Sequence, residues 1–228
     1  MRRIGVVAGV FGTIATLLLC ASAGPTYADA RVVFGFDGSA GKQGVPAPWT
    51  FRRWSPVTGL GEYVAVARVA RRDGVPVLCV KSARSGFLVG MKRAVDVAVV
   101  RTVSWSWSAE ALPEGGNFRE RATNDQALQI LFAFDGGKVV SYIWDATGPI
   151  GAIGSGLSWQ DDVRVIVLQA GTANLGRWVT EQRSLYDDYR KLFGTEPPHL
   201  EGVAIQSNSQ HTDSSGAGCV GPITLTEK

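Results

Sequence analysis

Carboxylates are the side chains in this sequence that could act on a substrate. Cleavage of a glycosidic bond needs two of them at a set separation across a cleft. The candidates lie at the ends of expected strands or in loops, and they are Glu110, Glu114, Asp125, Asp145, Asp161 and Asp162. Their spacing selects no pair, and acidic residues in such places more often hold turns through side-chain hydrogen bonds. If the protein cleaves a polysaccharide, we expect Asp125 to work with Glu114 or Asp161 as acid and base.

Tryptophans are the side chains that could hold a sugar, and the chain has seven of them. Indole rings stack on the apolar faces of sugar rings, and they also bury large areas in protein cores. Trp144 ends an expected strand and Trp159 lies in an irregular glycine-rich loop, so these two are our aromatic candidates for ligand contact. Trp105 and Trp107 are expected in the core, because they continue an apolar strand face that begins at Val103.

The strand that carries Trp105 and Trp107 has a second, polar face. From Thr102 onward the sequence alternates between apolar and polar residues, a period of two that is typical of a strand with one buried face. The polar side presents Ser104 and Ser106, followed by Ser108. We therefore expect a ring-shaped ligand to contact Ser104 and Ser106, or the loop tryptophans, together with Asp125 and Asp161.

Metal and nucleophile chemistry have weaker signals. Sandwich domains of secreted proteins often seat a structural calcium ion between loops, and Asp37, Asn208 and Asp213 could supply oxygen ligands, although none has the spacing of a dedicated loop. The segment at 154–156 reads Gly-Ser-Gly without the strand-to-helix context of a nucleophile elbow. The sequence therefore assigns no catalytic residue and no cofactor, and structural calcium is the one open possibility.

The first 30 residues have the layout of a secretory signal peptide. A basic start at residues 1–3 is followed by an apolar run at 4–19 and by small-residue cleavage patterns that end at Ala23 and at Ala30. We expect cleavage after Ala30, with Ala23 as the alternative. An uncleaved anchor is the weaker interpretation, because the apolar run is short for a membrane span. The mature chain, 31–228, is then a single β-sandwich domain in the periplasm or outside the cell, without a membrane span.

Export decides how the cysteines are interpreted. Cys20 leaves with the leader unless it carries a lipid, an alternative that Leu19 disfavours because lipoprotein signals usually have a small residue there. Cys79 and Cys219 remain in an oxidising compartment, where they could form a disulfide. Two separate buried thiols are the other possibility, since a sequence does not give the distance between them.

Composition and charge exclude some classes of partner. A formal net charge of +3 and arginine pairs such as Arg52-Arg53 and Arg71-Arg72 are too little for a nucleic-acid footprint. Hydrophobic residues make up 45% of the chain and charged residues 19%, as in a globular protein. The 28 glycines and 10 prolines divide the chain into short segments, which favours an all-β fold.

Apolar runs and alternating segments predict about ten short strands, at residues 32–36, 49–54, 62–71, 75–82, 87–95, 99–109, 126–134, 139–144, 163–169, 200–206 and 223–225. Short strands joined by turns indicate a sandwich or barrel. At 177–193, apolar residues recur at steps of three and four, which predicts one late amphipathic helix whose apolar stripe begins at Trp178. Gly194 can cap this helix, and the prolines at 197 and 198 prevent its continuation.

Several motifs in this order carry a family resemblance. The most specific is Trp178-x-x-Glu181-x-Arg183-Ser184-Leu185-x-x-Asp188-Tyr189-Arg190-x-x-Phe193-Gly194, followed by Pro197. Earlier landmarks are 73–78 leading to Ser82, the alternating strand at 103–107 with Leu112-Pro113 and Gly115, and Asp125 before 128–134. In these motifs the chain resembles the secreted bacterial family catalogued as domain of unknown function 3047. The resemblance implies a jelly-roll sandwich similar to galactose-binding-like and carbohydrate-binding modules, and it implies no established activity.

The chain also departs from the pattern of that family. Asn208 and Gln210 are amides where the family usually has acidic residues, and Gln129 stands in place of an arginine.

Together these observations favour an exported, non-catalytic protein that binds a glycan or another component of the cell envelope. One alternative is an enzyme that acts on polysaccharide through paired carboxylates. The other is a structural or interaction protein of the envelope that docks through the late helix. Neither the oligomeric state nor the ligand follows from the sequence.

Overall fold

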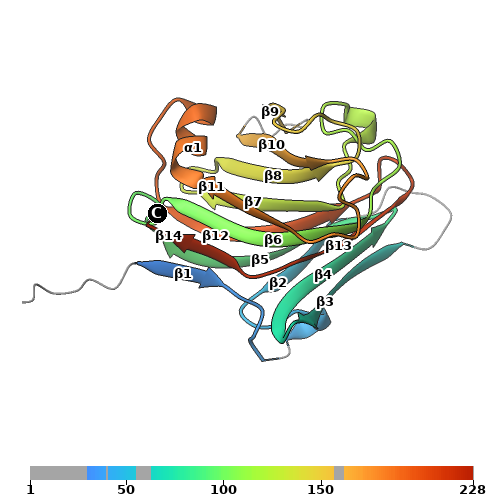
Figure 1. The fold of residues 1–228 in the computed structure, drawn as a ribbon, viewed down its shortest axis with the longest axis horizontal. Coiled ribbons are helices and arrows are strands. Elements are labelled where there is room, and N and C mark those ends of the chain that lie inside the picture. Colours follow the sequence, from blue (N-terminus) through green and yellow to red (C-terminus); the bar gives the residue numbers. More distant parts are fainter. Residues whose placement is uncertain (1–29, 40, 55–62, 157–161, 228) are drawn as a thin grey trace, which may run out of the picture.

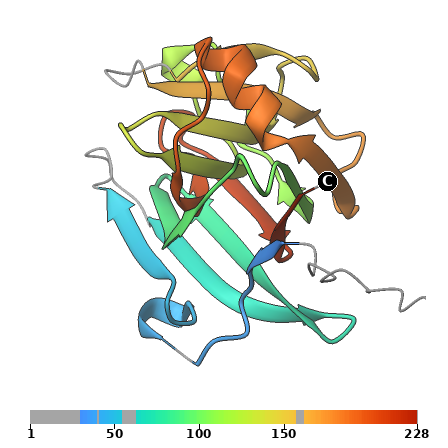
Figure 2. The ribbon, with the colours of Figure 1, turned by 90° about the vertical axis from the view of Figure 1, so that its left-hand side faces the viewer.

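Two β-sheets packed face to face form the molecule (Figures 1 and 2). The computed structural model describes residues 30–39, 41–54, 63–156 and 162–227. The first sheet has the order β1 (Arg31–Phe34), β14 (Ile223–Thr226), β6 (Thr102–Ala111), β13 (Ser215–Val220), β4 (Val75–Ala83) and β3 (Val64–Arg72), with β11 (Val179–Ser184) paired to β6. The second has the order β2 (Thr50–Trp54), β5 (Gly86–Val95), β12 (Leu200–Asn208), β7 (Leu128–Phe134), β8 (Val139–Asp145), β10 (Val163–Ala170) and β9 (Ile153–Ser155).

The described residues thus contain fourteen strands, two short 3-10 turns, η1 (Lys42–Gly44) and η2 (Arg121–Thr123), and one α-helix. Neighbouring strands are antiparallel except β8 and β10, which are parallel. This confirms the predicted all-β, jelly-roll sandwich with one late helix. The strand count exceeds the prediction because β9, β11 and β13 lie in segments where the sequence shows no recognisable alternation.

The expectation for Trp105 and Trp107 is confirmed. Both indoles point between the sheets, with 2% and 0% of their surface exposed. From the second sheet, Tyr142 stacks on Trp105 at 5.3 Å between ring centres, and Trp144 meets Trp107 at 5.8 Å. Aromatic contacts of this kind add to the free energy already gained by burying the rings. Strand β6 therefore organises the core through one face and leaves its serine face outside.

Strand β13 explains why two glycines interrupt the last part of the chain. A Cβ on Gly218 would lie 2.6 Å from the carbonyl oxygen of Ser108 and 2.7 Å from a methyl carbon of Leu128. At this point β13 lies too close to β6 in its own sheet and to β7 in the other sheet for any side chain. The glycine content that hides β13 from sequence analysis is the same feature that allows it to pack.

The late helix is shorter than predicted. Residues 179–184 form strand β11, and α1 runs only from Leu185 to Phe193. Ser184 caps its first turn by accepting a hydrogen bond from the Asp187 N–H at 3.2 Å, and Gly194 ends it in the left-handed conformation with φ of 72°. Trp178 therefore does not begin a helical stripe and lies outside the helix, which corrects the sequence prediction.

Helix α1 lies against one end of the sandwich (Figures 1 and 2), where a polar cluster around the buried Asp188 holds it. Asp188 accepts two hydrogen bonds from Arg183, at 2.6 and 2.9 Å, and a third from the Tyr142 hydroxyl at 2.7 Å. These contacts join the helix to β11 and to β8 of the second sheet. Burial, reinforced by the nearby Asp188 carboxylate, raises the pKa of Tyr142 well above its ordinary value, so its hydroxyl keeps its proton.

Candidate functional site

A groove of about 350 Å³ lies on the outer face of the first sheet, where the serine face of β6 is exposed. Its floor includes two cross-strand pairs of hydroxyl side chains. Ser104 lies opposite Thr224 of β14, and Ser106 lies opposite Thr180 of β11. The Ser106 and Thr180 hydroxyls form a hydrogen bond with each other at 2.8 Å. The hydroxyls of Ser104 and Thr224 have no hydrogen-bond partner among the described residues. The groove thus offers hydroxyl groups to a ligand.

The walls of the groove are Trp178 on one side and the tip of the β3–β4 hairpin on the other. The guanidinium of Arg72 reaches across and lies 4.4 Å from the centre of the Trp178 ring. This is a cation–π contact, which holds the guanidinium plane in a defined position. Val77 also lines the groove, and its side chain is only 4% exposed although it belongs to the outer face of the sheet.

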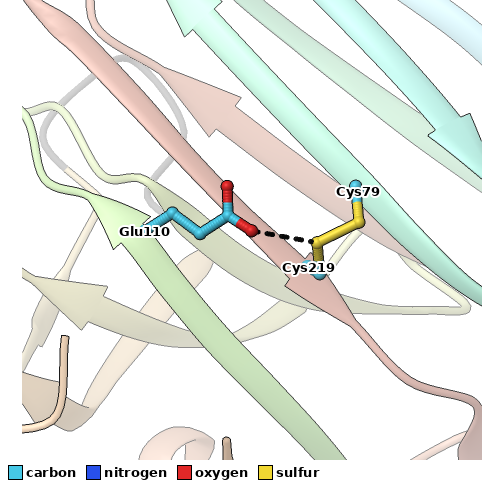
Figure 3. The surroundings of a disulfide bond; sticks show 3 residues. All are labelled: Cys79, Glu110 and Cys219. Carbon is cyan, nitrogen blue, oxygen red and sulfur yellow. Dashed lines mark hydrogen bonds between the residues drawn. A yellow bond between two sulfur atoms is a disulfide. The ribbon is translucent and has the colours of Figure 1, made fainter. Parts of the chain in front are cut away.

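A disulfide joins Cys79 of β4 to Cys219 of β13, beside the groove (Figure 3). The two residues face each other directly in the antiparallel pair, with Cα atoms 4.0 Å apart. Of the two possibilities left open by the sequence, the structure has the bridge. The sulfur of Cys219 lies 3.6 Å from Oε1 of Glu110, which is a contact without a donated hydrogen, because a disulfide sulfur carries none.

Asp125 was the leading acid candidate, and the structure gives it a different role. Its side chain is 0% exposed. Oδ2 accepts hydrogen bonds from the backbone N–H groups of His211 and Thr212, at 2.8 and 2.7 Å, and from the Thr212 hydroxyl at 2.9 Å. Oδ1 lies 2.8 Å from the amide of Asn208 and 3.1 Å from Nδ1 of His211. A carboxylate enclosed in this way holds the loop between β12 and β13 and cannot reach a substrate.

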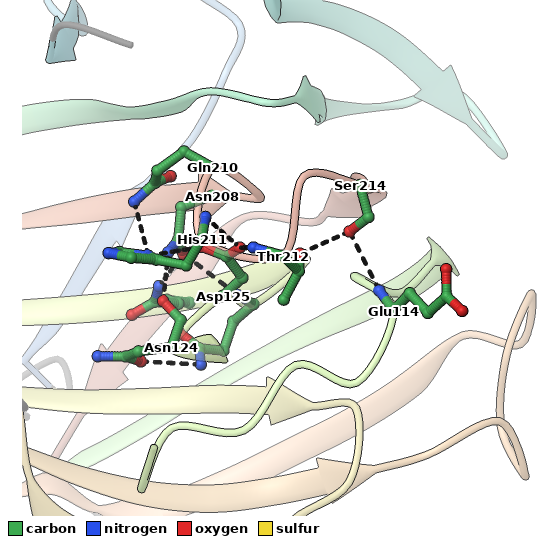
Figure 4. A network of polar contacts seen from close by, with 10 residues as sticks. Glu114, Asn124, Asp125, Asn208, Gln210, His211, Thr212 and Ser214 are labelled. Carbon is green, nitrogen blue, oxygen red and sulfur yellow. Dashed lines mark hydrogen bonds and ion pairs between the residues drawn. The ribbon is translucent and has the colours of Figure 1, made fainter. Parts of the chain in front are cut away.

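Glu114, the expected partner of Asp125, does not face it. Figure 4 shows the Glu114 carboxylate directed away from the Asp125 cluster, to which it is linked only through its backbone N–H and the Ser214 hydroxyl, at 3.1 Å. Asp145 is also 0% exposed, and it accepts bonds from three backbone N–H groups. The third candidate partner, Asp161, lies outside the described residues.

The aromatic candidates need a correction as well. Trp144 is 0% exposed, and its Nε1 donates to the carbonyl oxygen of Gly171 at 3.2 Å, so it belongs to the core and contacts no ligand from solvent. It ends a strand whose alternation places this position between the sheets. Trp159 lies outside the described residues. Trp178, which the sequence assigned to a helix core, instead lines the groove, as does the buried Trp105.

Two of the three calcium candidates are engaged in other contacts, whereas Asp37 lines a second hollow, away from both of them. Asp213 forms an ion pair with Arg84 at 2.9 Å. The side-chain oxygen of Asn208 accepts hydrogen bonds from the Gln126 N–H at 3.2 Å and from the Gln129 amide at 2.6 Å. Across the described ranges, no group of three or more His, Cys, Asp or Glu side chains could hold a metal ion.

The contact between Gln129 and Asn208 also accounts for two departures from the family pattern. The family pattern has an arginine at the first position and an acid at the second, and this chain has an amide at both. The two amides form a neutral hydrogen bond with each other, at 2.6 Å.

Glu181 faces inward from β11, and its chemistry is set by burial. Its Oε1 accepts hydrogen bonds from the indole of Trp107 at 3.3 Å and from the amide of Gln169 at 2.8 Å. Removal from water raises the pKa of the Glu181 carboxyl above its ordinary value, because burial disfavours the charged form. Glu181, like Arg183 and Asp188 of the same motif, therefore joins the sheets and the helix. The polar residues of the motif that carries the family resemblance therefore mainly hold β11 and α1 against the rest of the fold.

The sequence profile of one protein family, described as "Protein of unknown function (DUF3047)", matches residues 52–224, which is most of the chain. The chain belongs to the DUF3047 family. No curated protein matches this DUF3047 chain significantly.

Some solved structures are similar to the DUF3047 chain. The xyloglucanase domain of NopAA, a type three effector from Sinorhizobium fredii in complex with cellobiose, has 12% identity and a TM-score of 0.43, over 81% of this chain and 100% of that one. The low-affinity xylan-binding module CBM86 from Roseburia intestinalis has 12% identity and a TM-score of 0.31, over 86% and 94%. Endoglucanase 3 of family GH12 from Trichoderma harzianum has 9% identity and a TM-score of 0.40, over 86% and 96%. These low scores carry no argument about the ligand of the DUF3047 chain.

The α-helix of the described part of the DUF3047 chain is too short and too polar to cross a membrane.

Proposed function

We propose that this DUF3047 protein binds a glycan in the groove between Trp178 and the β3–β4 hairpin. The observation that carries the proposal is the combination of hydroxyl groups on the floor with a partly buried indole in the wall. Sugars present hydroxyl groups for hydrogen bonding and apolar C–H faces for contact with aromatic rings. The hydroxyls of Ser104 and Thr224, which bond to no other residue that the structure describes, supply the first kind of contact, and the indole of Trp178 supplies the second.

We further propose that binding, rather than catalysis, is the role of this groove. Among the described residues that line it, Asp73 is the one carboxylate. Glycoside hydrolysis needs two. The buried acids Asp125, Asp145 and Asp188 are each occupied by several hydrogen-bond donors, which supports structural roles for them. Docking through the helix has no support either, because Leu185 and Tyr189 face the core and the described exposed hydrophobic residues all lie elsewhere.

The third part of the proposal is export. The basic start, the apolar run and the small residues before Ala30 support cleavage there. The disulfide agrees with an oxidising compartment. Mass spectrometry of the protein recovered from its native host should give Arg31 as the first residue, and a mature chain that begins at Met1 in the cytoplasm would contradict export.

The binding proposal is tested with a glycan array, followed by calorimetric titration of the mature chain. Thr224→Ala should weaken binding about two- to tenfold, the effect of losing one hydrogen bond. Thr226→Ala is the matched control, since Thr226 lies on the same strand and face but outside the groove. Trp178→Ala should weaken binding by about tenfold or more, because both the ring contact and the support of Arg72 are lost. Absence of binding to every glycan would refute the proposal, and equal effects of the two threonine variants would exclude this groove.

A further inference from the structure

The hairpin formed by β3 and β4 carries a net positive charge. Strands β3 and β4 and the turn between them carry four cationic side chains, Arg68, Arg71, Arg72 and Lys81, against the single carboxylate of Asp73. Their net charge is +3. The tip of this hairpin is one wall of the groove. A ligand in the groove therefore meets a wall with a net positive charge.

Arg72 is the cation placed to contact such a ligand. Its guanidinium carbon lies over the ring of Trp178, 4.4 Å from the ring centre, and its side chain remains 43% exposed. Its Nε is 3.6 Å from Oδ2 of Asp73, and its two terminal nitrogens donate to no described residue. An exposed ion pair at this distance contributes little and does not use up the guanidinium. The terminal N–H groups have the fork geometry that binds planar anions through two parallel hydrogen bonds.

The same contact changes what Trp178 can do. The guanidinium covers one face of the indole, so that face cannot stack on a neutral sugar ring. That face of the ring positions Arg72, and only the rest of the indole can contact the apolar face of a sugar. What the groove then presents to a ligand is a positioned cation above hydroxyl groups, those of Ser104 and Thr224.

We propose that the ligand of this groove is an acidic glycan, one whose sugar ring carries a carboxylate or a sulfate that Arg72 binds. This inference rests on the proposed glycan-binding function and names the class of its ligand. The acidic group pairs with the terminal nitrogens of Arg72, while the ring hydroxyls contact Ser104 and Thr224. Arg68 lies two pairs further along the outer face of β3, opposite Cys79, and adds attraction at longer range.

The test uses the mature, oxidised chain on an array that presents neutral, uronic-acid and sulfated versions of several polysaccharide backbones. Acidic members should bind at least about tenfold more tightly than their neutral counterparts, and the difference should shrink as salt is added. The uronic-acid and sulfated arms show which acidic group is preferred. Arg72→Gln should weaken acidic binding about ten- to a hundredfold and leave neutral binding nearly unchanged. Arg72→Lys, which keeps the charge but loses the fork, should recover only part of the affinity.

Arg121→Gln is the matched control, because it removes the same charge from η2, which does not line the groove. Thermal unfolding of each variant checks that the fold is retained. Equal binding of neutral and acidic glycans, or equal losses from Arg72→Gln and Arg121→Gln, would overturn the acidic ligand while leaving glycan binding in place. Absence of binding to every glycan on the array, neutral or acidic, would overturn both proposals.

Discussion

Replacing both Cys79 and Cys219 with serine is expected to destabilise the fold strongly. The bridge joins neighbouring strands in space but closes a loop of 140 residues in sequence. In the chain-entropy model, a cross-link across such a loop lowers the entropy of the unfolded chain by an amount worth about 5 kcal/mol at 25 °C. Measured values for native disulfides are commonly about 2–4 kcal/mol, so we expect a loss in that range or slightly above it.

The assay is equilibrium unfolding in guanidinium chloride, followed by tryptophan fluorescence, with the oxidised chain and the Cys79→Ser/Cys219→Ser variant in parallel. The midpoint should fall in the variant, and a reduced wild-type sample should behave like it. Ser108→Ala is a control for small changes on the same outer face, since Ser108 lies opposite Cys219 on β6. A loss below about 0.5 kcal/mol would refute the reasoning, because the unfolded chain would then gain nothing from release of the loop.

Three further predictions concern packing and burial. Glu181→Gln keeps the oxygen that accepts the Trp107 hydrogen bond but cannot ionise. Burial raises the pKa of the Glu181 carboxyl in the folded state, so the wild type is fully stable below the ordinary pKa of glutamate and loses stability as the pH rises through the folded-state pKa. Chemical unfolding should therefore find the variant more stable than the wild type at pH 7 and equally stable near pH 4. Tyr142→Phe should cost about 1 kcal/mol in the same assay at pH 7, and combined with Asp188→Asn the two effects should not add, because both act on one hydrogen bond. Gly218→Ala should cost about 1–3 kcal/mol or prevent folding, since its Cβ would lie 2.6 Å from the Ser108 oxygen on the neighbouring strand and 2.7 Å from Leu128 of the other sheet. An unchanged midpoint would contradict this close packing around Gly218.

Periodicity predicts those parts of the fold where one face is apolar and the other is polar. Strand β6 is the clearest case, and its inward tryptophans and outward serines lie as the alternation predicts. Strand β11 was missed because its inward positions are Glu181 and Arg183, polar residues whose hydrogen-bond partners come from other strands and from the helix. The capping pattern of Ser184 and Asp187 could have located the true start of the helix.

The groove could be predicted only in part, because it combines distant segments. The serine face of β6 is evident from alternation alone. Trp178 and the turn after Arg72 join it only because the first sheet brings β11 and the β3–β4 hairpin to opposite sides of that face. No spacing along the chain encodes a contact between residues 72 and 178.

The acidic residues that resemble catalytic acids in the sequence are those whose carboxylates accept the most hydrogen bonds inside the fold. Asp125 follows a long polar loop and precedes a buried strand, a place where an active-site acid could equally stand. The structure surrounds its carboxylate with donors from the loop between β12 and β13, chiefly His211 and Thr212. A general acid must exchange its proton with the substrate, so it needs an open path and a free oxygen. Arg72 differs in both respects, since it is exposed and its terminal nitrogens are unpaired within the described chain. This difference in exposure and hydrogen bonding supports a ligand site at Arg72, on the outer face of the first sheet, rather than at the buried Asp125.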